Sequence, residues 1–60
     1  MAIETRVAQK DKLHALLIVQ KSYEAQGIEA TMELKMLIKQ AITVMEAEDV
    51  SYVKEQVANG

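Results

Sequence analysis

Residues 31–48 read TMELKMLIKQAITVMEAE, and the spacing of the apolar residues in this stretch decides the fold class. The apolar positions recur at intervals of three and four residues, which at about 100° per residue gathers them on one face of a helix. Polar residues occupy the opposite face. The apolar face consists of Leu34, Leu37, Ile38, Ala41, Ile42, Val44 and Met45. The stretch therefore predicts an amphipathic helix over about residues 30–47.

A second helical pattern precedes this one, over about residues 4–26. Its main apolar face contains Leu13, Leu16 and Leu17 and extends to Tyr23, again at helical spacing. Residues with high helix propensity fill both stretches, and the sequence contains no proline that would break them. We therefore expect two consecutive helices.

Gly27 marks the end of the first predicted helix. Glycine readily adopts the left-handed conformation that often terminates a helix, and an apolar residue after it commonly packs back on the last turn. Ile28 and Tyr23 hold the two positions of that pairing. Thr31 has a side-chain oxygen that can cap the next helix. Because the connection is only a few residues long, the two helices are expected to lie antiparallel.

The apolar pattern changes after the second predicted helix. In a continuous helix Val50, Val53 and Val57 would point away from the main apolar face, so one partner could not bury both sets. Asp49 or Ser51 can cap the N-terminus of a new helix. The sequence therefore predicts a break and a short third helix over about residues 50–58. The alternative is one continuous helix whose last turns contact a different subunit.

These elements predict an all-α fold, with an antiparallel helical hairpin and a short C-terminal helix in a single domain over residues 1–60. The sequence has 60 residues, which is too short for two cores, and its lack of proline and its two glycines leave few turns for a β-rich fold. The lack of cysteine excludes a disulfide framework.

Apolar residues outside the two main faces predict self-association. Exposed apolar patches usually mark an interface, and a domain this small gains little stability from its own core. We expect a homodimer that forms a four-helix-type bundle, with a tetramer as the alternative. The residues predicted for this oligomer interface are Val7, His14, Ile18, Met32 and Met36.

The sequence offers no constellation for catalysis, metal binding or cofactor binding. His14 is the only histidine, and neither cysteine nor a suitably spaced glutamate accompanies it as a metal ligand. A general base would also need a nucleophile or a substrate pocket, and no such partner can be assembled. The two glycines do not form a phosphate-binding loop. We therefore predict a protein that is not an enzyme and has no cofactor.

The end of the chain carries the residues predicted to bind a partner protein. Methionine and tyrosine suit recognition, and an acidic cluster can dock on a basic surface. The predicted set is Glu46, Glu48, Asp49, Tyr52 and Val53. In the alternative interpretation the acidic residues are a solvated helix end, while Tyr52 and Val53 only cover the open end of the bundle.

The function expected from these features is that of a small regulatory or adaptor protein that binds another protein. The alternative is a nucleic-acid-binding regulator that uses a basic strip of Arg6, Lys10 and Lys21, although the net charge is −2. The predicted hairpin dimer resembles in architecture the plasmid regulator Rop, which binds paired RNA loops, but no sequence motif is shared. The lack of cysteine and of any long apolar stretch favours a cytoplasmic location without a membrane span.

Overall fold

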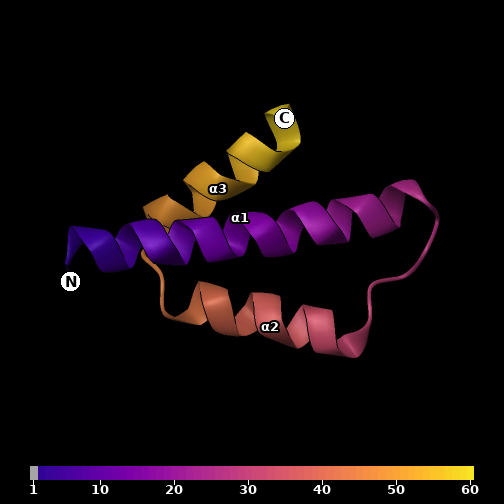
Figure 1. Ribbon diagram of the computed structural model, residues 1–60, viewed down its shortest axis with the longest axis horizontal. Coiled ribbons are helices and arrows are strands. Elements are labelled where there is room, and N and C mark those ends of the chain that lie inside the picture. The colour runs from indigo at the N-terminus through magenta and orange to yellow at the C-terminus, as the bar shows by residue number, and fades with distance from the viewer. Residues whose placement is uncertain (1) are drawn as a thin grey trace.

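The computed structural model describes residues 2–60, which form three α-helices in chain order (Figure 1). Helix α1 spans Ile3–Ala25, α2 spans Met32–Thr43 and α3 spans Ala47–Asn59. There is no β-strand in this part of the chain. The prediction of an all-helical fold is therefore confirmed.

The turn after α1 has the hydrogen bonds of a Schellman motif. The Ile28 N–H donates to the Tyr23 carbonyl at 2.9 Å, and the Gly27 N–H donates to the Glu24 carbonyl at 3.0 Å. Gly27 itself has a φ of 72°. The predicted helix stop is confirmed, because this backbone conformation is the one that glycine adopts without steric penalty.

Helix α2 begins at a capped residue. Thr31 has extended backbone angles, and its side-chain oxygen accepts a hydrogen bond from the Leu34 N–H at 3.2 Å. This bond satisfies one of the N–H groups that have no partner inside the helix. The cap predicted at Thr31 is thus present, and it fixes the direction in which α2 leaves the turn.

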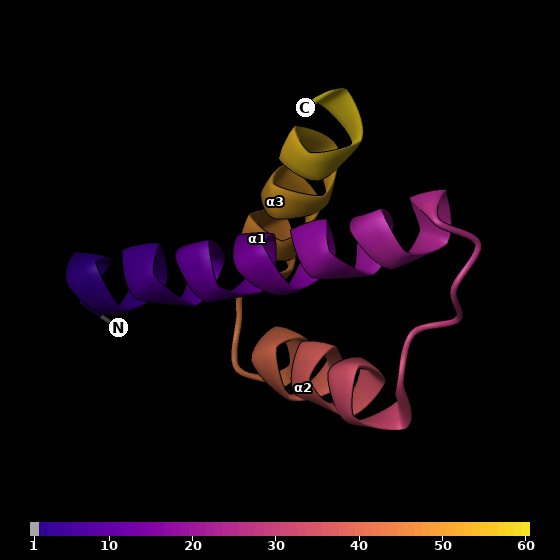
Figure 2. The same cartoon turned by 45° about the vertical axis from the view of Figure 1, so that its right-hand side comes forward.

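Both of the shorter helices pack on α1. Figure 1 shows α2 running back along α1 in the opposite direction, whereas α3 crosses α1 obliquely and runs in the same general direction. In both views α1 passes in front of α3, and its near side is covered by neither helix (Figures 1 and 2). The antiparallel hairpin is therefore present, and one side of its long helix faces the solvent.

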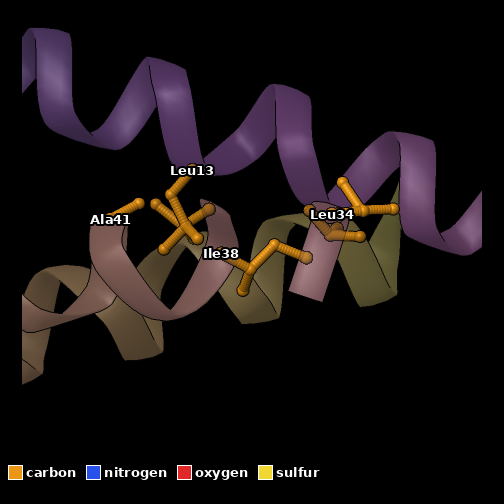
Figure 3. Close-up of a cluster of buried hydrophobic side chains, with 6 residues drawn as sticks. Leu13, Leu34, Ile38 and Ala41 are labelled. Atoms are coloured by element: carbon orange, nitrogen blue, oxygen red, sulfur yellow. The ribbon is translucent and has the colours of Figure 1, made fainter. Parts of the chain in front are cut away.

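The core lies where the three helices meet. Leu13 on α1 is fully buried, and it points toward α2, as Figure 3 shows. Val53 on α3, which is 2% exposed, belongs to the same cluster. The buried apolar residues of the described chain are Leu13, Leu34, Ile38, Ala41, Val53 and Val57. Leu13 thus lies at the centre of the contact between α1 and the other two helices, and other α1 residues such as Leu16 and Leu17 pack beside it.

The break before α3 occurs earlier than predicted. Helix α2 ends at Thr43 and α3 begins at Ala47, although the sequence pattern indicated a break near residue 48. Glu46 is the N-cap residue, and its side chain makes no capping hydrogen bond. Because the prediction looked for a residue that favours side-chain capping, it placed the start of α3 too late in the chain. Asp49 and Ser51, the predicted caps, lie inside α3.

The molecule is elongated for its mass. Its accessible surface is 4442 Å², while a compact monomer of this mass exposes about 3,900 Å². Its radius of gyration of 11.7 Å likewise exceeds the value of about 10.4 Å for a compact 60-residue domain. The three helices thus leave more of their surface in water than a compact fold would.

Gly27→Ala should lower the free energy of unfolding by about 1 kcal/mol, because a Cβ is unfavourable at positive φ. No atom lies within 4 Å of the Cβ position, so the cost comes from the backbone conformation and not from a clash. Urea unfolding followed by circular dichroism measures this change. Gly27→Asn is the matched control and should cost less, because asparagine tolerates the left-handed region. Unchanged stability in Gly27→Ala would contradict this account of the turn.

Candidate interaction surfaces

Arg6 near the start of α1 binds the acidic first turn of α3. Its Nε and Nη2 atoms each donate to one carboxylate oxygen of Asp49, at 2.9 Å in both cases. Nη2 also reaches Glu48 at 3.1 Å. The Asp49 side chain is only 10% exposed, whereas that of Glu48 is 79% exposed. The two-point contact with Asp49 therefore fixes the start of α3, and the contact with Glu48 is a surface ion pair of little energetic weight.

This contact lowers the pKa of Asp49. Hydrogen bonding to the Arg6 guanidinium is the main cause, and the charges of Arg6 and Lys10 act in the same direction. Partial burial of the carboxylate acts in the opposite direction but does not outweigh them. Asp49 is therefore held in its charged form at neutral pH and serves as a structural anion.

A second polar contact holds the other end of α3. The Lys21 Nζ atom on α1 donates to the Val57 carbonyl at 2.8 Å. Carbonyls in the last turn of a helix have no partner within the helix, and a positive charge there is favourable to the helix dipole. Arg6 and Lys21 thus attach α3 to α1 near both of its ends.

These contacts correct two of the predicted partner-binding residues. Asp49 is buried and binds Arg6, and Val53 is buried in the core, so neither is available to a partner on the surface. The signal that was missed is the spacing of four residues that places Asp49 on the same face of α3 as Val53 and Val57. The predicted residues that do lie on the surface are Glu46, Glu48 and Tyr52.

Tyr52 borders a shallow groove between α1 and α3. The Lys10 Nζ atom lies 5.5 Å from the centre of the Tyr52 ring, which is the geometry of a cation–π contact. The groove has a volume of about 240 Å³, and its lining residues are Lys10, Asp11, His14, Tyr52, Val53 and Gln56. The structure therefore brings His14 and Tyr52, predicted for different roles, to the same groove.

Three of the predicted interface residues gather on one side of α1. Val7 is 47% exposed and Ile18 is 43% exposed, while His14 is also exposed between them. Gln9 donates a hydrogen bond to the Val44 carbonyl, so its side of α1 faces α2. Val7 is two residues from Gln9, about 200° around the helix, and thus points away from α2. We call Val7, His14 and Ile18 the outer face of α1.

The two predicted methionines lie on a different side of the molecule. Met32 and Met36 are 71% and 54% exposed on α2. Met36 is two residues from both Leu34 and Ile38, which are buried against α1, and so it points away from α1. The five residues predicted for the oligomer interface therefore lie on two different sides of the molecule and do not form one continuous surface. We call Met32 and Met36 the methionine face.

The described residues show no arrangement for metal binding. No three His, Asp or Glu side chains within residues 2–60 lie close enough together to hold a metal ion. None of the three helices combines the length and the apolar character that crossing a membrane requires.

Comparison with known proteins adds no relative. No protein family, no curated protein and no solved structure matches the chain. The geometry of its own residues is therefore the basis for the function proposed below.

Acidification should remove the stabilisation that Asp49 provides. A carboxylate whose pKa is lowered by folding stabilises the protein above its unfolded pKa of about 3.9 and loses this effect as the pH falls through its folded pKa. Asp49→Asn should therefore lower the melting temperature at pH 7 and should flatten its decline between about pH 5 and pH 2. Glu48→Gln is the control and should change both much less, because Glu48 is exposed. Equal effects of the two variants would contradict the structural role of Asp49.

Proposed function

We propose that this chain is a small, non-enzymatic regulatory or adaptor protein that associates with itself and binds another protein. One observation carries the proposal: in residues 2–60, six apolar side chains are buried in the core and ten large apolar side chains are exposed. The exposed ones include members of both the outer face of α1 and the methionine face. Exposed apolar side chains that gather on one helix face are typical of an interaction site.

Self-association is assigned to the outer face of α1. This helix has 23 residues and is about 34 Å long, and the residues of its outer face are exposed, with His14 at the border of the groove beside α3. A 60-residue chain gains only a marginal net stability from its own core, so burial of this face against a second copy would add stability that the monomer lacks. The elongated shape of the chain supports the same assignment.

Binding of a different protein is assigned to the methionine face, with Tyr52 as a second candidate contact. Methionine side chains are flexible and polarisable, so they adapt to the shapes of different partners. Because Met32 and Met36 point away from α1, a dimer formed through α1 would leave them free. Separate surfaces for the second copy and for the partner are what an adaptor requires.

The contacts of the basic residues weaken the nucleic-acid alternative. Arg6 is engaged by Asp49 and Glu48, and one donor of Lys21 is used by the Val57 carbonyl. A phosphate backbone would have to compete with these bonds, and the net charge of −2 does not favour it. A salt-dependent mobility shift with DNA or RNA would support the alternative and would count against the proposal.

Self-association should make the melting temperature rise with protein concentration, because mass action favours the dimer. Sedimentation equilibrium should give a dimeric mass, and Ile18→Lys should reduce it to that of a monomer. Ser51→Lys, an exposed position on α3, is the matched control and should leave the mass unchanged. A melting temperature independent of concentration together with a monomeric mass would refute self-association.

Partner binding should depend on the methionine face. Met32→Lys combined with Met36→Lys should reduce the recovery of bound proteins from a lysate of the source cells by at least about tenfold, since about 1.4 kcal/mol of lost binding energy corresponds to that factor. The control with the same added charge is Ser51→Lys combined with Asn59→Lys. Quantitative mass spectrometry compares the two. Equal recovery with both variants would exclude the methionine face as the binding site.

A further inference from the structure

The outer face of α1 belongs to a longer seam of exposed residues. Positions on this side of the helix alternate between intervals of three and four residues, the spacing that lets two helices pack along their length. All of these residues are exposed in the structure. The seam consists of Glu4, Val7, Asp11, His14, Ile18, Lys21 and Ala25.

The charges in the seam select the direction in which a second copy can pack. In a parallel pair each residue meets its own copy, so Asp11 would face Asp11 and Lys21 would face Lys21. Like charges placed opposite each other in an interface are strongly unfavourable. In an antiparallel pair, acidic residues from one half of the seam meet basic residues from the other half. The charge pattern is therefore complementary to itself only in the antiparallel direction.

Among the antiparallel alignments, one pairs six of the seven seam residues with chemically matching partners and leaves only Ala25 without one. It places Val7 opposite Ile18, Asp11 opposite His14 and Glu4 opposite Lys21, and the two-fold symmetry makes each pairing occur twice. The N–H of the His14 imidazole can donate a hydrogen bond to the Asp11 carboxylate of the second copy. Lys21 has three donors and uses one for the Val57 carbonyl, so it retains two for Glu4.

The alignment shifted by one repeat is less well matched. It pairs Val7 with Ala25 and His14 with Ile18, although it also places Asp11 opposite Lys21, which is a favourable charge pair. The imidazole would then face an aliphatic side chain and lose a polar partner on burial, which is unfavourable. The small Ala25 side chain would also bury less apolar area against Val7 than Ile18 does.

We propose that two copies of this chain pack α1 against α1 in the antiparallel direction, with Val7 opposite Ile18 and Asp11 opposite His14. This inference rests on the proposed self-association and adds its geometry. The partner is a second copy of the chain, and the specificity for it lies in the charge pattern of the seam.

Disulfide trapping tests this geometry, because the chain contains no cysteine of its own. Val7→Cys and Ile18→Cys each change a partly exposed residue, so the helices should remain intact by circular dichroism. After mixing and mild oxidation, the two variants should form a covalent dimer with each other at least about tenfold faster than Val7→Cys forms one with itself. The double variant should give a dimer with two disulfides, as measured by mass spectrometry.

The controls separate failure of the geometry from failure of self-association. Rapid disulfide formation by Val7→Cys alone would show a parallel pair, and preferential trapping of Val7→Cys with Ala25→Cys would show the shifted alignment. Either result overturns the inference while self-association stands. A monomeric mass for the unmodified chain in sedimentation would overturn both. Trapping between positions 7 and 18 in a protein of dimeric mass supports the inference.

Discussion

The burial of Leu13 is the constraint on which the rest of the structure depends. Helices α2 and α3 each pack on α1 and hardly touch each other, and Leu13 is the one fully buried α1 side chain in the cluster that their apolar faces share. A buried leucine accounts for several kcal/mol of stability in a typical core, which is a large fraction of the total for a small domain. The long helix therefore organises the fold, and the other two helices depend on it separately.

Polar contacts then determine where α3 lies on α1. Apolar burial of Val53 and Val57 is non-directional and would allow α3 several crossing angles. The hydrogen bonds of Arg6 to Asp49 and of Lys21 to the Val57 carbonyl restrict α3 to one of them. The ion pairs of Arg6 with Asp49 and Glu48 also neutralise part of the basic surface of α1, so the docking of α3 changes which partners this helix can attract.

The sequence was sufficient for the parts of the fold that local patterns determine. The apolar periodicity identified α1 and α2, and Gly27 and Thr31 identified the turn between them, because capping chemistry acts over only a few residues. The start of α3 was misplaced because Glu46 begins that helix without a side-chain cap. The pairing of Arg6 with Asp49 spans 43 positions, and no local pattern reveals a contact at that distance.

The sequence identified which residues belong to the candidate surfaces, but it did not show how these residues are arranged in space. Exposed apolar residues could be recognised on both helices, but whether they form one surface depends on how each helix is rotated about its axis. The packing of Leu34 and Ile38 against α1 fixes that rotation for α2 and turns Met32 and Met36 away from Val7. The groove beside Tyr52 likewise required the crossing of α3 over α1.

The separate attachment of α2 and α3 to α1 gives the two shorter helices different sensitivities to solution conditions. Helix α2 is held by apolar burial and by a backbone turn, so added salt leaves its attachment largely unchanged, while cooling weakens it. Helix α3 is held in part by the charges of Arg6 and Asp49, which mobile ions screen. A rise in ionic strength thus weakens the attachment of α3 more than that of α2, although the burial of Asp49, Val53 and Val57 limits the effect.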